Sequence, residues 1–208
     1  ILAETLSSII KKGEITERYY NPCNLFSEVH FVLLNNDKPD LDKVKKMAGS
    51  AKIYIHNSPI PFLIKLFGFI PVVFSFLASE TVSKIIQIKP DIIRPHDSIY
   101  NTYVAFRVKK LSNIPYATSL HINPYDDMVK YALKNKDWQT YFGYLLYQNT
   151  HKKILQGANL VIGVYNYINR YANKLELANY KTLYNIINPK GLLIKKDYNI
   201  SENVKIII

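Results

Sequence analysis

The sequence predicts an α/β protein built on a parallel sheet with helices on both of its faces. Apolar runs typical of strands alternate along the chain with segments of helical periodicity, an order that favours a covered parallel sheet. Between residues 88 and 121, two short apolar runs flank one helical segment, and the crossover of such a βαβ unit is almost always right-handed. The composition, 48% hydrophobic and 21% charged over 208 residues, is that of one folded domain of ordinary size.

Helices are predicted where apolar residues recur every three or four positions. The first helix carries Leu2, Leu6 and Ile9 on one face and has Gly13 as its stop. The predicted helices are residues 2–12, 41–48, 98–111, 126–133, 138–155 and 165–177. One stripe of the helix over 138–155 is expected to face the core rather than to form a base-stacking platform: Trp138, Tyr141, Leu145 and Gln148.

Strands are predicted where short apolar runs end in turn residues. The run 29–34 is closed by two asparagines and an aspartate, and the run 88–94 carries Pro90 near its beginning, where a strand tolerates proline. The predicted strands are residues 29–34, 52–56, 88–94, 116–120, 159–164 and 182–184, followed by a loop over 185–201.

Residues 62–78 form the most apolar stretch, with Lys65 as their one charge. The stretch is slightly too short to span a bilayer, and Gly68 and Pro71 interrupt it. A kinked pair of helices packed on the sheet is therefore expected here. Contact with an anionic membrane surface is the alternative, because aromatic and leucine side chains in a basic protein suit that interface.

The net charge of +11 favours an acidic partner: nucleic acid, anionic lipid head groups or a phosphorylated substrate. Residues 129–200 hold eleven lysines and arginines against three acids, so most of the excess lies in the C-terminal third. A solvated basic face without a partner is the other interpretation. The lone Cys23 cannot form an internal disulfide, which favours a reducing, cytoplasmic location.

Several motifs are absent from the sequence. No two of the seven glycines are separated by a single residue, and none has the spacing of a phosphate-binding loop. There is no HExxH, no cysteine pair, no GxSxG and no aromatic RNA-reading motif. The sequence therefore predicts no resident cofactor and no metal site, and it makes a nucleic-acid partner unlikely.

Polar residues follow the predicted strands of the central βαβ unit. His96 and Asp97 come after its first strand, and His121 and Asn123 come after its second. Because parallel strands bring their carboxyl ends to one edge of the sheet, these residues are expected to meet where open α/β sheets bind ligands. Such a cluster could hold sugar hydroxyls or stabilise a transferring phosphate.

Four motifs follow one another in an order that resembles the N-terminal, acceptor-side domain of GT-B glycosyltransferases of the family 4 type. They are PDIIRPH at 90–96, IPYATSLH at 114–121, ANLVIGVY at 158–165 and LYNIIN at 183–188. Their order and spacing carry the resemblance, which covers residues 88–208 better than the preceding part of the chain.

The resemblance implies one half of a GT-B fold. Residues 1–200 would form a Rossmann-like acceptor domain that lacks its first strand. Residues 201–208 would be the end of a linker and the first strand of a donor-binding domain. The activity implied is transfer, with retention, from a nucleotide-diphosphate sugar to a glycan, lipid or other acceptor, without an obligatory metal. Since the family's donor-binding motifs belong to the second domain, this chain alone is expected to be inactive.

The resemblance also implies residue roles. His121 matches the histidine near the transferred sugar and is the candidate catalytic residue. His96 and Asp97 match positions that line the cleft, Asn123 belongs to the same edge loop, and Asn185 matches the interdomain turn. Cell-envelope polysaccharide, lipid-linked glycan and protein glycosylation are all compatible pathways.

Two other functional classes stay open. One is a basic nucleic-acid-binding module, although the basic residues are scattered and no reading motif is present. The other is a non-catalytic scaffold attached to a membrane through residues 62–78. A cytoplasmic protein is expected in each case, with peripheral attachment to the inner face of the membrane as a variant.

Overall fold

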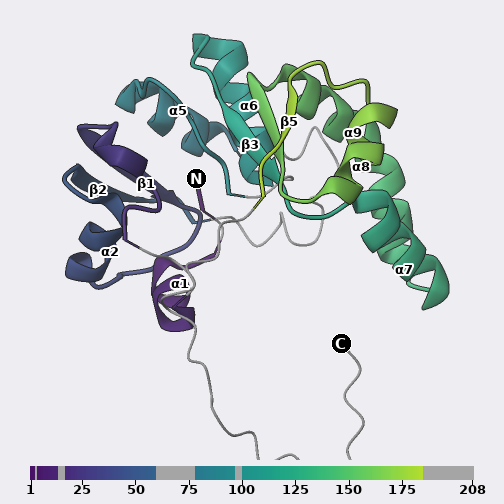
Figure 1. The fold of residues 1–208 in the computed structure, drawn as a ribbon, viewed down its shortest axis with the longest axis horizontal. Helices are drawn as coiled ribbons and strands as arrows, with labels where there is room; N and C mark the ends of the chain where they lie inside the picture. Colours follow the sequence, from purple (N-terminus) through teal and green to yellow (C-terminus); the bar gives the residue numbers. More distant parts are fainter. Residues whose placement is uncertain (3, 14–16, 60–77, 97–99, 185–208) are drawn as a thin grey trace, which may run out of the picture.

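The computed structural model describes residues 1–2, 4–13, 17–59, 78–96 and 100–184. Strands and helices alternate along this part of the chain (Figure 1). The strands are β1 (Glu28–Leu33), β2 (Lys52–Asn57), β3 (Ala117–Leu120), β4 (Leu160–Gly163) and β5 (Tyr180–Thr182). The α-helices are α1 (Leu6–Lys12), α2 (Leu41–Ala48), α5 (Ser79–Ile88), α6 (Tyr100–Ser112), α7 (Lys130–Lys134), α8 (Trp138–Gly157) and α9 (Asn169–Lys174). Shorter helical segments are η1 (Pro22–Asn24), the π-helical η2 (Pro124–Val129) and η3 (Asn166–Ile168).

The strands pair in parallel in two groups, β1 with β2 and β3 with β4 and β5. Two short extended segments lie between the groups. Leu2 forms a parallel bridge with Leu33 of β1, and Ile93 forms one with Tyr116, the residue before β3. The Ile1 nitrogen donates to the Arg94 carbonyl (3.1 Å), and the His96 N–H donates to the Ile1 carbonyl (3.0 Å), which connects the two segments.

The order across the molecule is therefore β2, β1, the Leu2 segment, the Ile93 segment, β3, β4, β5. The chain winds outward from its first segment to β2 and then returns to the middle to wind the other way. This is the strand order of a Rossmann-like, doubly wound sheet. The predicted class, an α/β protein with a parallel sheet of this type, is confirmed.

Helices cover both faces of the β1–β2 pair. On one face, α1 and α2 pack on alternate strand residues such as Phe31 and Leu33. On the other face, Val32 shares a larger core with Val82 and Ile85 of α5. That larger core continues through α6, β3, α8, β4 and α9, so it runs beneath both halves of the sheet.

Helix α2 begins and ends at the predicted residues, because both of its boundaries are local signals. The Asp40 carboxylate accepts hydrogen bonds from the N–H groups of Asp42 and Lys43, and Gly49 follows the last turn at φ 62°. The first helix, in contrast, begins at Leu6 rather than at Leu2, with Thr5 as its N-cap. The prediction of its start was wrong because the Leu2 backbone pairs with β1 instead.

The predicted strand over 88–94 is reduced to the bridge at Ile93, which corrects that prediction. Ile88, the first residue of the predicted strand, is instead the last residue of α5. Val82 and Ile85 of this helix face the core at helical spacing, and Lys89 ends it in the left-handed conformation. Helix α5 was not predicted. The segment predicted as one helix over 165–177 consists of the short η3 followed by α9. The last strand, predicted over 182–184, is β5, which begins two residues earlier and is centred on Lys181.

The stripe predicted to face the core on α8 does not do so, since Trp138 and Leu145 are exposed. The buried face is the opposite one and carries Tyr147, His151 and Ile154. Both faces of the helix are apolar in sequence, and the packing of α9 and β4 selects between them. The predictions for 185–201 and 201–208, and that for 62–78 apart from Ala78, lie outside the described residues.

Candidate functional site

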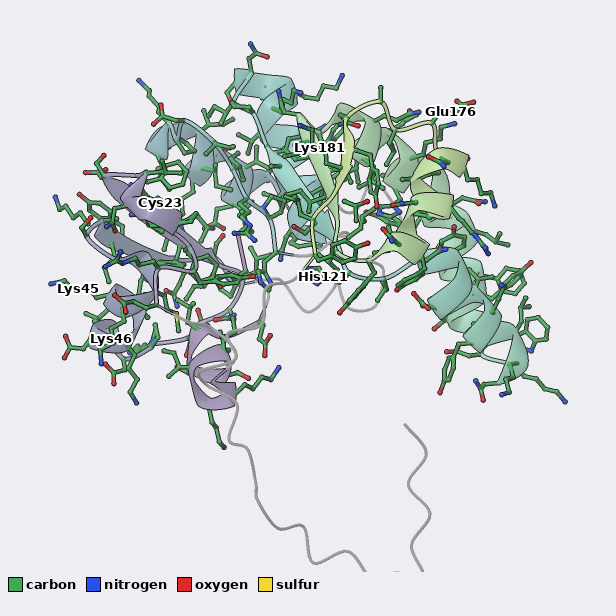
Figure 2. The ribbon with its side chains drawn as sticks, viewed as in Figure 1. Cys23, Lys45, Lys46, His121, Glu176 and Lys181 are labelled. Atoms are coloured by element: carbon green, nitrogen blue, oxygen red, sulfur yellow. The ribbon has the colours of Figure 1, made fainter. Side chains whose placement is uncertain are left out.

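The candidate site lies at the carboxyl ends of the strands, where the two halves of the sheet meet. From this junction the chain proceeds to β1 and β2 on one side and to β3, β4 and β5 on the other. The helices that connect the strands lie on opposite faces of the sheet on the two sides, α1 and α2 on one face and α6, α8 and α9 on the other. The point where the winding reverses is the topological switch point, where open α/β sheets bind ligands. Figure 2 shows His121 at this edge, between the two halves of the molecule.

Two histidines converge at the junction. His96 follows the Ile93 bridge, and the Ile1 carbonyl anchors its backbone. His121 follows Leu120, the fully buried last residue of β3. The centroids of the two imidazole rings are 6.4 Å apart, with the ring planes inclined by 34°. The predicted meeting of these histidines at one sheet edge is confirmed.

Both imidazoles have a pKa below the ordinary histidine value. Desolvation lowers the pKa of His96 most, followed by the positive charge of Arg94 and the neighbouring His121, while Glu4 acts weakly in the opposite direction. The pKa of His121 is lowered by desolvation and then by Arg94. At neutral pH both rings are therefore uncharged, and each offers one N–H donor and one acceptor nitrogen.

Arg94 provides the positive charge of the site. Its guanidinium carbon lies 5.3 Å from the centroid of the Tyr19 ring, a cation–π contact that restrains the side chain. A guanidinium can bind a carboxylate or phosphate through two parallel hydrogen bonds. The site thus combines two neutral hydrogen-bonding rings with one exposed cation.

A carboxylate is held at the same edge by the loops that follow β3 and β4. Asp127 Oδ2 accepts hydrogen bonds from the Asn123 N–H (2.7 Å) and from the Tyr167 hydroxyl (3.0 Å). The Tyr167 ring stacks on Tyr165, with centroids 6.0 Å apart. Desolvation and the bond to Asp127 both raise the pKa of Tyr167, so its hydroxyl stays a donor at neutral pH. The arrangement presents an oriented carboxylate, and the Tyr167 hydroxyl also lies 3.4 Å from the His121 carbonyl oxygen.

The other predicted site residues have different outcomes. Asn123 lies at the edge, but it is buried, and its backbone N–H serves the Asp127 carboxylate. Asp97 and Asn185 lie outside the described residues. The structure therefore brings together three of the five predicted residues, without testing the role of any of them.

Sequence reasoning missed Tyr167 and did not single out Asp127. The signal for Asp127 was its place in the loop after β3, among other polar residues. Tyr167 follows β4, whose carboxyl end reaches the same edge, so the loop after every parallel strand should have been considered. The contact between Tyr167 and Asp127 joins residues 40 positions apart and has no local sequence signal.

Neither a metal site nor a membrane span is evident in the described part of the chain. No group of three or more histidine, cysteine, aspartate or glutamate side chains there could hold a metal ion. No helix among these residues combines the length and the apolar character needed to cross a bilayer.

The fold and the site together define a Rossmann-like α/β protein with a polar site at its topological switch point. In comparisons with known proteins, no family model and no curated protein matches this sequence. The class therefore rests on the strand order and on the site geometry described above.

Proposed function

We propose that this chain supplies the acceptor site of a retaining GT-B glycosyltransferase. The observation that carries the proposal is the convergence of His96 and His121 beside Arg94 at the switch point. Uncharged imidazoles can donate to and accept from sugar hydroxyls, and a guanidinium can pair with a diphosphate. The order of the four sequence motifs that resemble family 4 enzymes supports the same assignment.

In the proposed reaction, the bond from the sugar to a nucleotide diphosphate breaks while the acceptor oxygen forms the new glycosidic bond, and the hydroxyl proton passes to the departing diphosphate. The negative charge that develops on the leaving diphosphate needs fixed cations or backbone N–H groups, an electrostatic contribution that is often the largest in catalysis. His121 would hold the transferred sugar, and the Asp127 carboxylate would orient an acceptor hydroxyl. A second, donor-binding domain would close over this edge and exclude water.

The test is sugar binding to the 208-residue chain, measured by ligand-observed NMR. The probes are glucose and N-acetylglucosamine oligosaccharides and a short-chain polyprenyl diphosphate sugar. His121→Ala and His96→Ala are each expected to weaken binding of the sugar by about tenfold, the effect of one lost hydrogen bond at the upper end of its range.

His30→Ala is the matched control, because this half-buried histidine contacts His56 (3.0 Å between ring nitrogens) within the β1–β2 pair rather than at the strand ends. Sugar binding that is equally insensitive to all three substitutions would contradict the proposal. Preferential binding of DNA, with an affinity that falls steeply with salt, would support the nucleic-acid alternative instead.

A further inference from the structure

Six large apolar side chains are exposed on the hairpin formed by α7 and α8. Their exposed fractions lie between 38% and 64%. We name this set the hairpin patch: Tyr131, Leu133, Trp138, Phe142, Leu145 and Leu146. Figure 1 shows α7 at the outer edge of the molecule, away from the sheet. Single exposed apolar residues are common on protein surfaces. The four members on α8, however, fall within about 100° of one face at 3.6 residues per turn, and an apolar group of this kind marks an interaction site.

The patch is not the core-facing side of α8. Trp138 and Tyr147 are nine residues apart, about two and a half turns at 3.6 residues per turn, so they lie on opposite faces. The same separation relates Phe142 to His151 and Leu145 to Ile154. Tyr147, His151 and Ile154 are buried, and their counterparts in the patch are exposed.

The outward face of α8 changes character halfway along the helix. In the second half, Asn149, Lys153 and Gln156 occupy the face that Trp138 and Phe142 occupy in the first, and they are exposed. The apolar surface is therefore confined to the end of the helix beside α7. Core packing explains the buried side of this helix, but it gives no reason for an apolar outward side.

Two rings of the patch, those of Trp138 and Phe142, cluster with the ring of the half-buried Tyr141. Trp138 lies edge-on to Tyr141 (6.2 Å between centroids), and Phe142 contacts both rings, at 6.4 Å and 5.5 Å. Tryptophan and tyrosine are enriched at the boundary between lipid and water, because their rings are apolar and their N–H and O–H groups are polar.

Positive charge surrounds the patch. Residues 130–153 contain five lysines and a single acid, Asp137. The Asp137 carboxylate is occupied at the N-terminus of α8, where it accepts from the Thr140 N–H (3.1 Å) and hydroxyl (2.7 Å). Lys134 and Lys136 are exposed, and neither forms an ion pair within the described part of the chain.

We propose that the hairpin patch is a docking surface for an anionic lipid bilayer. Its aromatic rings and leucines would enter the head-group region, and Lys134 and Lys136 would pair with lipid phosphates, as in amphipathic segments that lie on membranes. A second copy of the chain fits less well, since a two-fold contact would bring these lysines against their own copies. The patch differs from the stretch 62–78 that the sequence suggests, and the proposal does not depend on the proposed function.

Trp138 makes the test specific, because it is the one tryptophan in the sequence. The 208-residue chain is mixed with vesicles of phosphatidylcholine containing phosphatidylglycerol, and with vesicles of phosphatidylcholine alone. Trp138 emission is expected to shift to shorter wavelength with the anionic vesicles, and brominated lipid is expected to quench it. The double substitution Lys134→Gln, Lys136→Gln should lower partitioning roughly 30-fold, at about 1 kcal/mol per lysine.

Phe142→Asp with Leu146→Asp should abolish both the shift and co-sedimentation. The matched control is Leu111→Asp with Leu41→Asp, which places the same two charges at exposed leucines on α6 and α2 and should leave binding unchanged. The proposal is overturned if vesicles sediment the protein without altering Trp138 emission, because another segment then makes the contact. In parallel titrations, the protein is concentrated without vesicles or mixed with a single-stranded oligonucleotide. The proposal is equally overturned if Trp138 emission responds to either of these and not to anionic vesicles, or if it responds to no addition.

Discussion

At the scale of single residues, the site depends on how its surroundings determine the charge of His96 and His121. Desolvation and the guanidinium of Arg94 act in the same direction on both rings. A positive charge on either ring would be unfavourable beside Arg94, so neutral imidazoles are the state that the fold accommodates. This charge state suits hydrogen bonding to hydroxyl groups rather than the binding of an anion by the histidines themselves.

The lowered pKa values predict that the protein loses stability on acidification. In the unfolded chain these histidines bind protons near the ordinary value of 6.5, whereas in the folded protein they bind them only at lower pH. The contribution of these groups to stability is therefore fully present above about pH 6.5 and falls as the pH drops through that value. His56, whose pKa is lowered by desolvation and by His30, adds to the effect.

The measurement is the free energy of unfolding in urea at pH 7.5 and at pH 5.5. His96→Asn should reduce the difference between the two values, because the amide keeps a polar side chain that does not titrate. An equal pH dependence in the wild type and in the variant would show that His96 is not desolvated as described.

At the scale of elements, the C-terminal end of α8 is fastened by side chains from other parts of the chain. The last four carbonyls of a helix have no partner within it. The hydroxyl of Tyr116, the residue before β3, donates to the Ile154 carbonyl, and Lys109 of α6 donates to the Gly157 carbonyl (2.8 Å). Asn179, before β5, donates to the carbonyls of Leu155 and Ala158. These bonds hold the long helix against the strands that end at the site.

Lys109→Met tests this anchoring. The substitution keeps the aliphatic part of the side chain but removes the ammonium group, which also donates to Asn159 Oδ1 (2.9 Å). We expect a loss of about 1 kcal/mol in the free energy of unfolding, from the missing hydrogen bonds and the lost cation at the helix end. Lys153→Met, at an exposed position of the same helix, should change stability by less than about 0.5 kcal/mol. Equal effects of the two substitutions would contradict this role of Lys109.

At the scale of the whole molecule, the two groups of strands are joined by short backbone bridges and by one shared core. The core contains Val32 of β1 together with Leu120 of β3 and Val161 of β4. Ile93 contributes to the bridges and to the core. Its backbone forms hydrogen bonds with the residues on either side of Tyr116, and its side chain is buried in the shared core. The site at the strand ends is formed only while the bridges and the shared core hold the two groups of strands together.

This arrangement predicts that the described part of the chain unfolds in one cooperative transition and that Ile93→Ala destabilises the folded state. Truncating a buried isoleucine should lower the free energy of unfolding by about 2–5 kcal/mol. Ile92→Ala, at the exposed neighbouring position, should have little effect. The transition is followed by Trp138 fluorescence and by far-UV circular dichroism, and the two curves should coincide. Separate midpoints in the wild type would mean that the halves fold independently.

Part of the site was predictable from the sequence, and the reason is visible in His96 and His121. Each ends a short apolar run, and the handedness of the connection through α6 follows from the chirality of L-amino acids. Their shared edge therefore required no knowledge of distant contacts. Arg94 and the Asp127–Tyr167 pair needed coordinates, because their relation to the histidines depends on side-chain packing between separate loops.

The sequence alone determined the α/β class, the parallel direction of the central strands and the limits of α2, because alternation, crossover handedness and capping are local properties of the chain. Only the tertiary structure decided that Leu2 lies between the two halves of the sheet, and which apolar face of α8 is buried. A two-residue strand segment has no periodicity to detect. A helix that is apolar on opposite faces is oriented by the elements packed against it.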